Sequence, residues 1–198
     1  YKNTSYSGIF YQDRFFGLRK VLSLVFVIFL FAFSSILSAQ VTGDYRTNGN
    51  VNFTTSTNWQ TYNGTSWVAA GSAPNASNGT VTIQSGHTAS VNITTTITSL
   101  DVYGSIGMVS GVTLTILGDV HIYPGGTLTM PNSNSNVPNL VVYGNYTNEG
   151  TSNFNKSNVI VAGNFASPVG SAVDNNGVLI VGGNVSGILN VTGNDSNS

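Results

Sequence analysis

A short motif that alternates apolar and variable residues and ends in glycine recurs along the chain. Its clearest copies occupy residues 140–144, 159–163 and 179–183, and each is followed by asparagine and another apolar residue. Looser copies end at Gly86, Gly104 and Gly118. The interval between successive motif glycines is shortest from Gly104 to Gly118 and averages about 19 residues. Self-similarity of this kind indicates a repeat architecture, which restricts the possible folds more than any other feature of the sequence.

Each copy of the motif has the pattern of a β-strand, because alternation at period two places residues such as Leu140 and Val142 on one side. A repeat of about 19 residues with glycine corners matches one coil of a β-helix, whereas a propeller blade takes about 40. Ordering one coil costs on the order of 20 to 40 kcal/mol, and burying three to five apolar side chains returns only about 5 to 15 kcal/mol. Coils must therefore stack on one another. We predict an all-β parallel β-helix, or solenoid, of about five to six coils over residues 81–198.

The corners of this solenoid are predicted at the motif glycines, because sharp turns need φ values that only Gly, or less readily Asn, tolerates. These corner residues are Gly104, Gly118, Gly144, Gly163 and Gly183. The residues that follow the last four of them are Asp119, Asn145, Asn164 and Asn184. Stacked at one corner, their side chains could form a ladder in which each amide donates to one coil and accepts from another. Gly-Asn is also good turn chemistry without any ladder, so both interpretations stay open.

Residues 40–80 differ from the repeats and contain both tryptophans, Trp59 and Trp67, on either side of an Asn63-Gly64 hairpin signal. A solenoid needs a cap over its first coil, which would otherwise expose a strand edge and an apolar face. We interpret this segment as a β-rich amino-terminal cap. The alternative is an aromatic platform on which Trp59 and Trp67 contact a glycan.

An apolar run at residues 21–37 follows a basic cluster and precedes two small residues. The basic residues are Arg14, Arg19 and Lys20, and the small ones are Ser38 and Ala39. This layout is typical of a secretory signal peptide, with cleavage expected near residues 39–40. A membrane anchor is the alternative, although the apolar run is shorter than the roughly 20 residues that span a bilayer. Residues 1–39 are thus predicted to be an unstructured leader with a signal peptide.

Five short segments also resemble the amino-terminal region of large surface proteins that bacteria export by the type IX secretion route. They are residues 43–46, the Asn58-Trp59 and Ser66-Trp67 pairs, residues 83–88 and residues 125–129. The resemblance implies a right-handed parallel β-helix, export across both membranes and an adhesin-like role. No carboxy-terminal sorting domain is present in the sequence, and we expect the natural protein to continue into further domains.

The charged residues are few and scattered, which argues against catalysis and against nucleic-acid binding. After residue 39 there are two cations and six anions, a formal charge of −4. His87 and His121 are far apart in the sequence and the chain has no cysteine, so we expect no metal site, no cofactor and no disulfide. Asp101 and Asp119 could stack on adjacent coils, but they occupy different positions in their motifs and should not face each other.

These observations predict a secreted or cell-surface structural solenoid, adhesin-like and without catalytic activity of its own. Its expected partners are extracellular polysaccharide or cell-surface components, with membrane contact only through the signal peptide. One alternative is a carbohydrate-binding module that uses Tyr45, Trp59, Trp67 or Tyr103, and another is a degenerate enzyme of the polysaccharide lyase type. A hydroxyl face resembling that of β-helical ice-binding proteins, formed by Thr113, Thr115, Thr127 and Thr129, would be only two rows deep.

Overall fold

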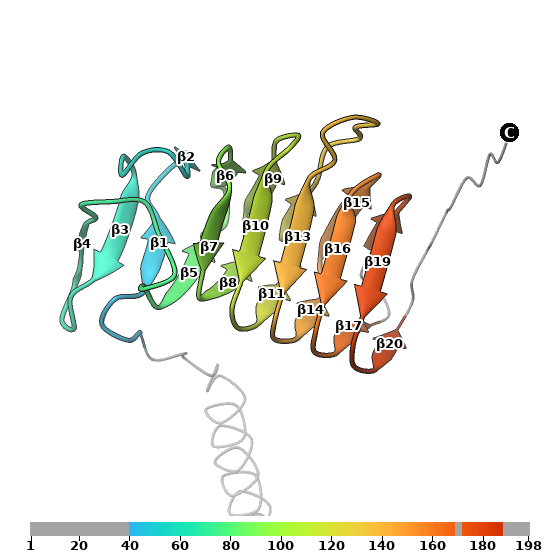
Figure 1. The fold of residues 1–198 in the computed structure, drawn as a ribbon. Helices are drawn as coiled ribbons and strands as arrows, with labels where there is room; N and C mark the ends of the chain where they lie inside the picture. Colours follow the sequence, from blue (N-terminus) through green and yellow to red (C-terminus); the bar gives the residue numbers. More distant parts are fainter. Residues whose placement is uncertain (1–39, 169–171, 188–198) are drawn as a thin grey trace, which may run out of the picture. The chain divides into compact units, whose positions relative to one another are not determined.

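The computed structural model describes residues 40–168 and 172–187 (Figure 1). The predicted signal peptide at residues 1–39 and the polar tail at residues 188–198 lie outside this part of the chain. Within the described ranges, no helix has the length and apolarity needed to cross a membrane.

The described chain is built from strands that form three sheets, here named A, B and C. Sheet A has the spatial order β20 (Val185–Gly187), β17 (Phe165–Ser167), β14 (Tyr146–Asn148), β11 (Val120–Ile122), β8 (Ser99–Val102), β5 (Thr80–Ile83), β1 (Tyr45–Thr47), β3 (Trp59–Tyr62) and β4 (Trp67–Ala69). Sheet B has the order β18 (Ala172–Asn175), β15 (Thr151–Asn155), β12 (Thr127–Thr129), β9 (Ser105–Met108), β6 (Thr88–Val91) and β2 (Val51–Asn52). Sheet C has the order β19 (Val178–Val181), β16 (Asn158–Val161), β13 (Asn139–Val142), β10 (Thr113–Ile116) and β7 (Thr95–Ile97).

The chain visits sheets A, B and C once per coil, and every pairing between coils is parallel. Along sheet A the residues in register are Val81, Leu100, Val120, Tyr146, Phe165 and Val185. Successive members are almost evenly spaced in the sequence, except that the coil from Val120 to Tyr146 is longer because it contains the loop of residues 131–138 between β12 and β13. The predicted all-β parallel solenoid is confirmed, with about five turns.

The motif glycines belong to two different corners, which corrects the assumption that they mark a single one. Gly118, Gly144 and Gly163 each follow a strand of sheet C, whereas Gly104 follows β8 of sheet A. The short interval between Gly104 and Gly118 therefore separates two corners of one coil. The strands that precede the two corners have the same alternation of apolar and variable residues. The motif therefore cannot tell which corner a given glycine occupies.

Glycine is required at the corner after sheet C by close packing and not by a left-handed backbone. Gly118, Gly144, Gly163 and Gly183 are absent from the residues with positive φ. A Cβ atom on Gly163 would lie 2.5 Å from the carbonyl oxygen of Gly144, and one on Gly183 would lie 2.7 Å from that of Gly163. Neighbouring coils therefore approach each other backbone to backbone at this corner, where no side chain fits.

The inward positions of all three sheets form one continuous core of apolar side chains. Leu140, Val142, Val159 and Val161 have no exposed surface, and Leu179 and Val181 pack partly buried against this core, as the alternation indicates. On the sheet A side, the rings of Tyr146 and Phe165 stack with centroids 5.1 Å apart and an interplanar angle of 3°.

An antiparallel hairpin, β3–β4, extends sheet A beyond β1 and covers the amino-terminal end of the solenoid (Figure 1). The Asn63-Gly64 signal lies in its turn, where the Asn63 side chain accepts hydrogen bonds from the backbone N–H groups of Thr65 and Ser66. However, β1 and β2 already pair in parallel with β5 and β6. The parallel ladder thus begins inside residues 40–80, and the antiparallel part of the predicted cap is the hairpin alone.

Candidate functional site on the outward face of sheet A

Two adjacent rows of outward side chains on sheet A bring together residues from successive coils. The first row is set by the strand register, in which Arg46 pairs with Thr82, Thr82 with Asp101, Asp101 with His121 and His121 with Thr147. The second row follows the ends of the same strands and contains Tyr103, Tyr123 and Glu149. Their N–H groups donate to the carbonyl oxygens of the preceding coil, at 2.9, 2.9 and 2.7 Å respectively.

Asp101, Tyr103, His121, Tyr123 and Glu149 form a compact group, named here the Asp101 cluster. The Tyr123 ring lies 4.0 Å from the Tyr103 ring at 13° and 3.8 Å from the His121 ring at 16°. Two near-parallel rings at these distances must cover opposite faces of Tyr123. The cluster therefore contains a stack of three rings, in which Tyr103 remains 40% exposed.

The His121 imidazole also binds across to the next coil, because its Nε2 lies 3.0 Å from Oε2 of Glu149. Burial raises the pKa of the half-buried Asp101 carboxylate, an effect that nearby His121 opposes and Asp44 reinforces. Among the described residues, no hydrogen bond reaches this carboxylate. Burial, and next its hydrogen bond with Tyr103, raises the pKa of Tyr123. The cluster thus holds a poorly solvated acid beside an imidazole and two phenols.

The residues considered as glycan contacts separate into buried and surface positions. Trp59 is 1% exposed, its indole N–H donates to the Asn52 carbonyl oxygen at 3.0 Å, and its ring packs edge-on against Phe53. Tyr45 is 5% exposed and is also part of the core. These two aromatic side chains close the end of the solenoid, so the structure corrects their candidacy as ligand contacts.

Trp67 lies on the surface of the hairpin, but one face of its ring is already occupied. The Arg46 guanidinium carbon sits 4.4 Å from the Trp67 ring centroid, while Arg46 Nε donates to Oε1 of Gln60 at 2.8 Å. Tyr62 packs against the same indole, with centroids 5.4 Å apart. Trp67 and Tyr103 are therefore the two candidates that remain accessible, both along the outward side of sheet A.

His87 lies apart from this cluster, in the turn that leads into β6. Its Nδ1 lies 2.8 Å from the Thr47 hydroxyl and 3.2 Å from the Gly49 amide nitrogen. Because Thr47 Oγ1 already accepts from the Gln84 N–H at 3.0 Å, its own proton can donate to His87. No group of three or more His, Cys, Asp or Glu with metal-binding geometry occurs within residues 40–168 and 172–187.

The corner after sheet C carries a row of side-chain hydrogen bonds that links four coils. The Asn145 N–H donates to the Asp119 carboxylate at 2.7 Å, the Asn164 N–H to the Asn145 side-chain oxygen at 3.0 Å, and the Asn184 N–H to that of Asn164 at 2.9 Å. Side-chain amide donation joins the same partners at 3.2 Å (Asn145 to Asp119) and 3.1 Å (Asn164 to Asn145). The four side chains are exposed, so this ladder lies on the surface. Asp119 belongs to this ladder, and its carbonyl oxygen accepts the N–H of Leu100, but the register partner of Asp101 is His121 and not Asp119.

Sequence reasoning missed a second ladder at the start of the sheet C strands. The Asn158 amide donates to the side-chain oxygen of Asn139 at 2.9 Å, and the Asn139 amide donates to the Thr113 hydroxyl at 3.2 Å. The recurrence of asparagine before the motif, at positions 139 and 158, was the signal that could have found it. Inside the core, the Tyr146 hydroxyl pairs with the Ser152 hydroxyl at 2.7 Å, and Ser152 donates to the Asn148 side chain at 3.0 Å.

The predicted threonine face is divided between two sheets, since Thr113 and Thr115 lie on β10 of sheet C and Thr127 and Thr129 on β12 of sheet B. They cannot form one surface. On sheet C, the outward position of Thr115 becomes Val141, Ile160 and Ile180 in later coils.

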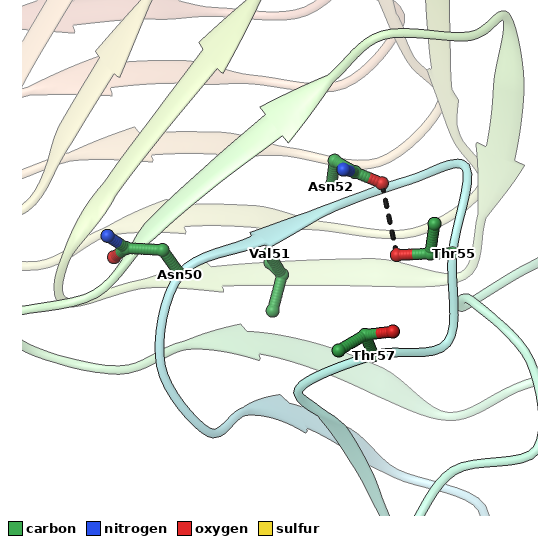
Figure 2. A pocket seen from close by; sticks show the side chains of 5 residues that line it. All are labelled: Asn50, Val51, Asn52, Thr55 and Thr57. Atoms are coloured by element: carbon green, nitrogen blue, oxygen red, sulfur yellow. Dashed lines mark hydrogen bonds between the residues drawn. The ribbon is translucent and has the colours of Figure 1, made fainter.

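A shallow hollow of about 410 Å³ lies beside the loop that follows β2 (Figure 2). Asn50, Val51, Asn52, Thr55 and Thr57 line it, and the Thr55 hydroxyl donates to the Asn52 side-chain oxygen at 3.2 Å. None of these side chains titrates or is a strong nucleophile, so the hollow offers hydrogen bonds but no acid–base chemistry. The Asp101 cluster is therefore the richer candidate site.

No protein-family model, curated protein or solved structure matches this chain.

Proposed function

We propose that the protein is an exported, non-catalytic structural solenoid that serves as a rigid, adhesin-like spacer at the bacterial surface. The observation that carries this proposal is the parallel pairing of successive coils along three sheets, with one register shift between β15 and β18, around a core of buried apolar side chains. Each coil completes the hydrogen bonds of its neighbour, so the assembly resists bending and extension along its axis. At about 4.8 Å per coil, five coils span roughly 24 Å.

On sheets B and C, the distribution of outward charge supports a spacer over an enzyme, whereas the acids that lie together, Asp101 and Glu149, are on sheet A. The outward row of sheet B consists of Asn52, Ser90, Gly107, Thr129, Asn153 and Asp174, which are small or polar with a single charge. The outward row of sheet C changes from threonine to aliphatic residues. Neither row carries the paired acid and base that glycoside cleavage needs.

Export rests on the leader at residues 1–39 and on the resemblance to proteins of the type IX route. The test is to express the full chain in a Gram-negative host and to sequence the amino terminus of the product. We expect export to the periplasm or beyond, with the mature protein beginning at Gln40. Retention in the inner membrane with residues 1–39 still attached would contradict the proposal.

A further inference from the structure

The Asp101 carboxylate lies beside His121 but accepts no hydrogen bond from the described residues. It is half-buried on the outward side of β8, and burial raises its pKa. No described residue donates a hydrogen bond to it. A carboxylate with reduced hydration and no hydrogen bond destabilises the folded state when it is ionised. Side chains that cost stability in this way are concentrated at functional sites.

The groups around Asp101 offer more hydrogen-bond acceptors than donors. Oε2 of Glu149 already contacts Nε2 of His121. With Asp101 and Glu149 ionised, the five-residue cluster is negative even when His121 is protonated. Nearby Asp44 adds to the negative potential, whereas Arg46, two strands away on the same row and held against neutral Gln60 and Trp67, keeps its positive charge but is not among the charges that act on Asp101. A ligand that fits must supply donors and positive charge, and an anionic one such as a polyuronate would be repelled.

The geometry also restricts how a ligand can approach. Both faces of the Tyr123 ring are covered, by Tyr103 and His121, so a sugar ring cannot stack on it. An extended peptide would need a free strand edge, yet β8 pairs with β5 and β11, and β11 pairs with β8 and β14. The outward neighbours in this row are Thr82 and Thr147, which form no apolar groove for a peptide side chain. With ring stacking, strand addition and apolar grooves excluded, a ligand must be recognised through hydrogen bonds and charge on the outward face of the sheet.

We propose that the Asp101 cluster binds an amino-sugar oligosaccharide, with the Asp101 and Glu149 carboxylates taking its ammonium groups and the Tyr103 and His121 edges its hydroxyl groups. An ammonium ion gives the half-buried carboxylate a charged hydrogen-bond donor, whereas its neighbour His121 acts on it through charge alone. Hydroxyl groups on the same ligand match the phenol and imidazole, which can each donate or accept. This site goes beyond the spacer, because the solenoid could serve as a rigid support without it.

Isothermal titration of the full chain with an unacylated β-1,4-linked glucosamine hexamer tests the proposal. We expect binding that weakens with added salt. Asp101→Asn should weaken it at least tenfold, and Glu149→Gln should weaken it as well. The matched control is Asp174→Asn, which removes a half-buried outward carboxylate from β18 of sheet B and should leave binding unchanged. Circular dichroism of each variant verifies that the fold is retained.

Three ligands of the same length separate this ligand class from others. The fully N-acetylated hexamer has no ammonium groups and should bind at least tenfold more weakly, and a hexauronate should not bind. Equal affinity of wild type and Asp101→Asn for the glucosamine hexamer, or equal binding of the acetylated hexamer, would overturn the proposal. Hexalysine binding that is equally tight and equally dependent on Asp101 would replace the glycan with a cationic polypeptide. Absence of binding would reject this site but not the spacer, whose test is export and processing.

Discussion

Replacing Phe165 by alanine tests whether the coils are stacked in the register described here. Phe165 has no exposed surface, stacks on Tyr146 of the preceding coil and meets Phe154 edge-on at 6.4 Å. Truncating a buried phenylalanine costs about 3 to 5 kcal/mol, depending on how far the site can collapse. Tyr146 cannot move readily into the space, because its hydroxyl is bound to Ser152, which is bound in turn to Asn148. We therefore expect the upper end of the range, about 4 to 5 kcal/mol.

Thermal unfolding followed by circular dichroism measures this loss. For a chain of this size about 1 kcal/mol corresponds to about 2 to 4 °C, so the melting temperature should fall by roughly 8 to 20 °C. The matched control is Tyr143→Ala, which truncates an aromatic side chain that is 61% exposed at a corner and should change the melting temperature by only a few degrees. A slip of one residue in β17 would turn Phe165 outward and Ala166 inward. Equal, small effects of both substitutions would refute the stacked register.

Three further substitutions test the corner packing, the exposed ladder and the buried charge. Gly163→Ala should destabilise the protein by about 1 to 3 kcal/mol in urea unfolding, because the new methyl group meets the rigid backbone of Gly144; an unchanged midpoint would contradict the close approach. Asn164→Ala should cost about 0.5 to 1.5 kcal/mol, since its ladder is solvent-exposed, and a loss above about 3 kcal/mol would indicate a buried one. For Asp101, burial raises the folded-state pKa, so its favourable contribution is complete below the ordinary value of 3.8 and is lost as the pH rises through the raised value. Asp101→Asn should therefore gain stability over wild type between about pH 4 and 7 and none below about pH 3.8, and a loss of stability at neutral pH would show that the carboxylate has a favourable partner.

The solenoid could be predicted because its stabilising features are periodic. The alternation at Leu140 and Val142 recurs in coil after coil, and a single coil cannot bury its apolar side chains alone. The positions of the corners were harder to predict from the sequence. Gly104 and Gly118 end strands of similar pattern, and only the register of β8 with β5 and of β10 with β7 shows that they occupy different corners.

The Asp101 cluster was missed because the motif describes inward positions and glycines, whereas the cluster lies at outward positions; the separation of 20 residues between Asp101 and His121, and between Tyr103 and Tyr123, was the available signal. Asp101 and His121 are brought together by strand pairing in sheet A, and Glu149 reaches them across the coil that contains the loop at residues 131–138. This loop leaves the register unchanged but lengthens the sequence interval between His121 and the strand that precedes Glu149. The choice between core and glycan contact for Trp59 stayed open for a related reason, since an aromatic residue beside a hairpin can face either side until the pairing of β1 with β3 is known.

Inward and outward side chains have different roles in this fold, which explains why the unfavourable charge of Asp101 can persist on its surface. Most of the free energy of folding comes from the inward columns and the three backbone ladders, so an unfavourable residue at an outward position of sheet A lowers the stability without abolishing the fold. Those positions are held at a fixed spacing of about 4.8 Å between coils, so side chains placed there are arranged in advance for a ligand that extends along the axis. A stable stack can thus tolerate an Asp101 carboxylate that accepts no hydrogen bond, and such a carboxylate is better explained by the ligand proposed above than by folding.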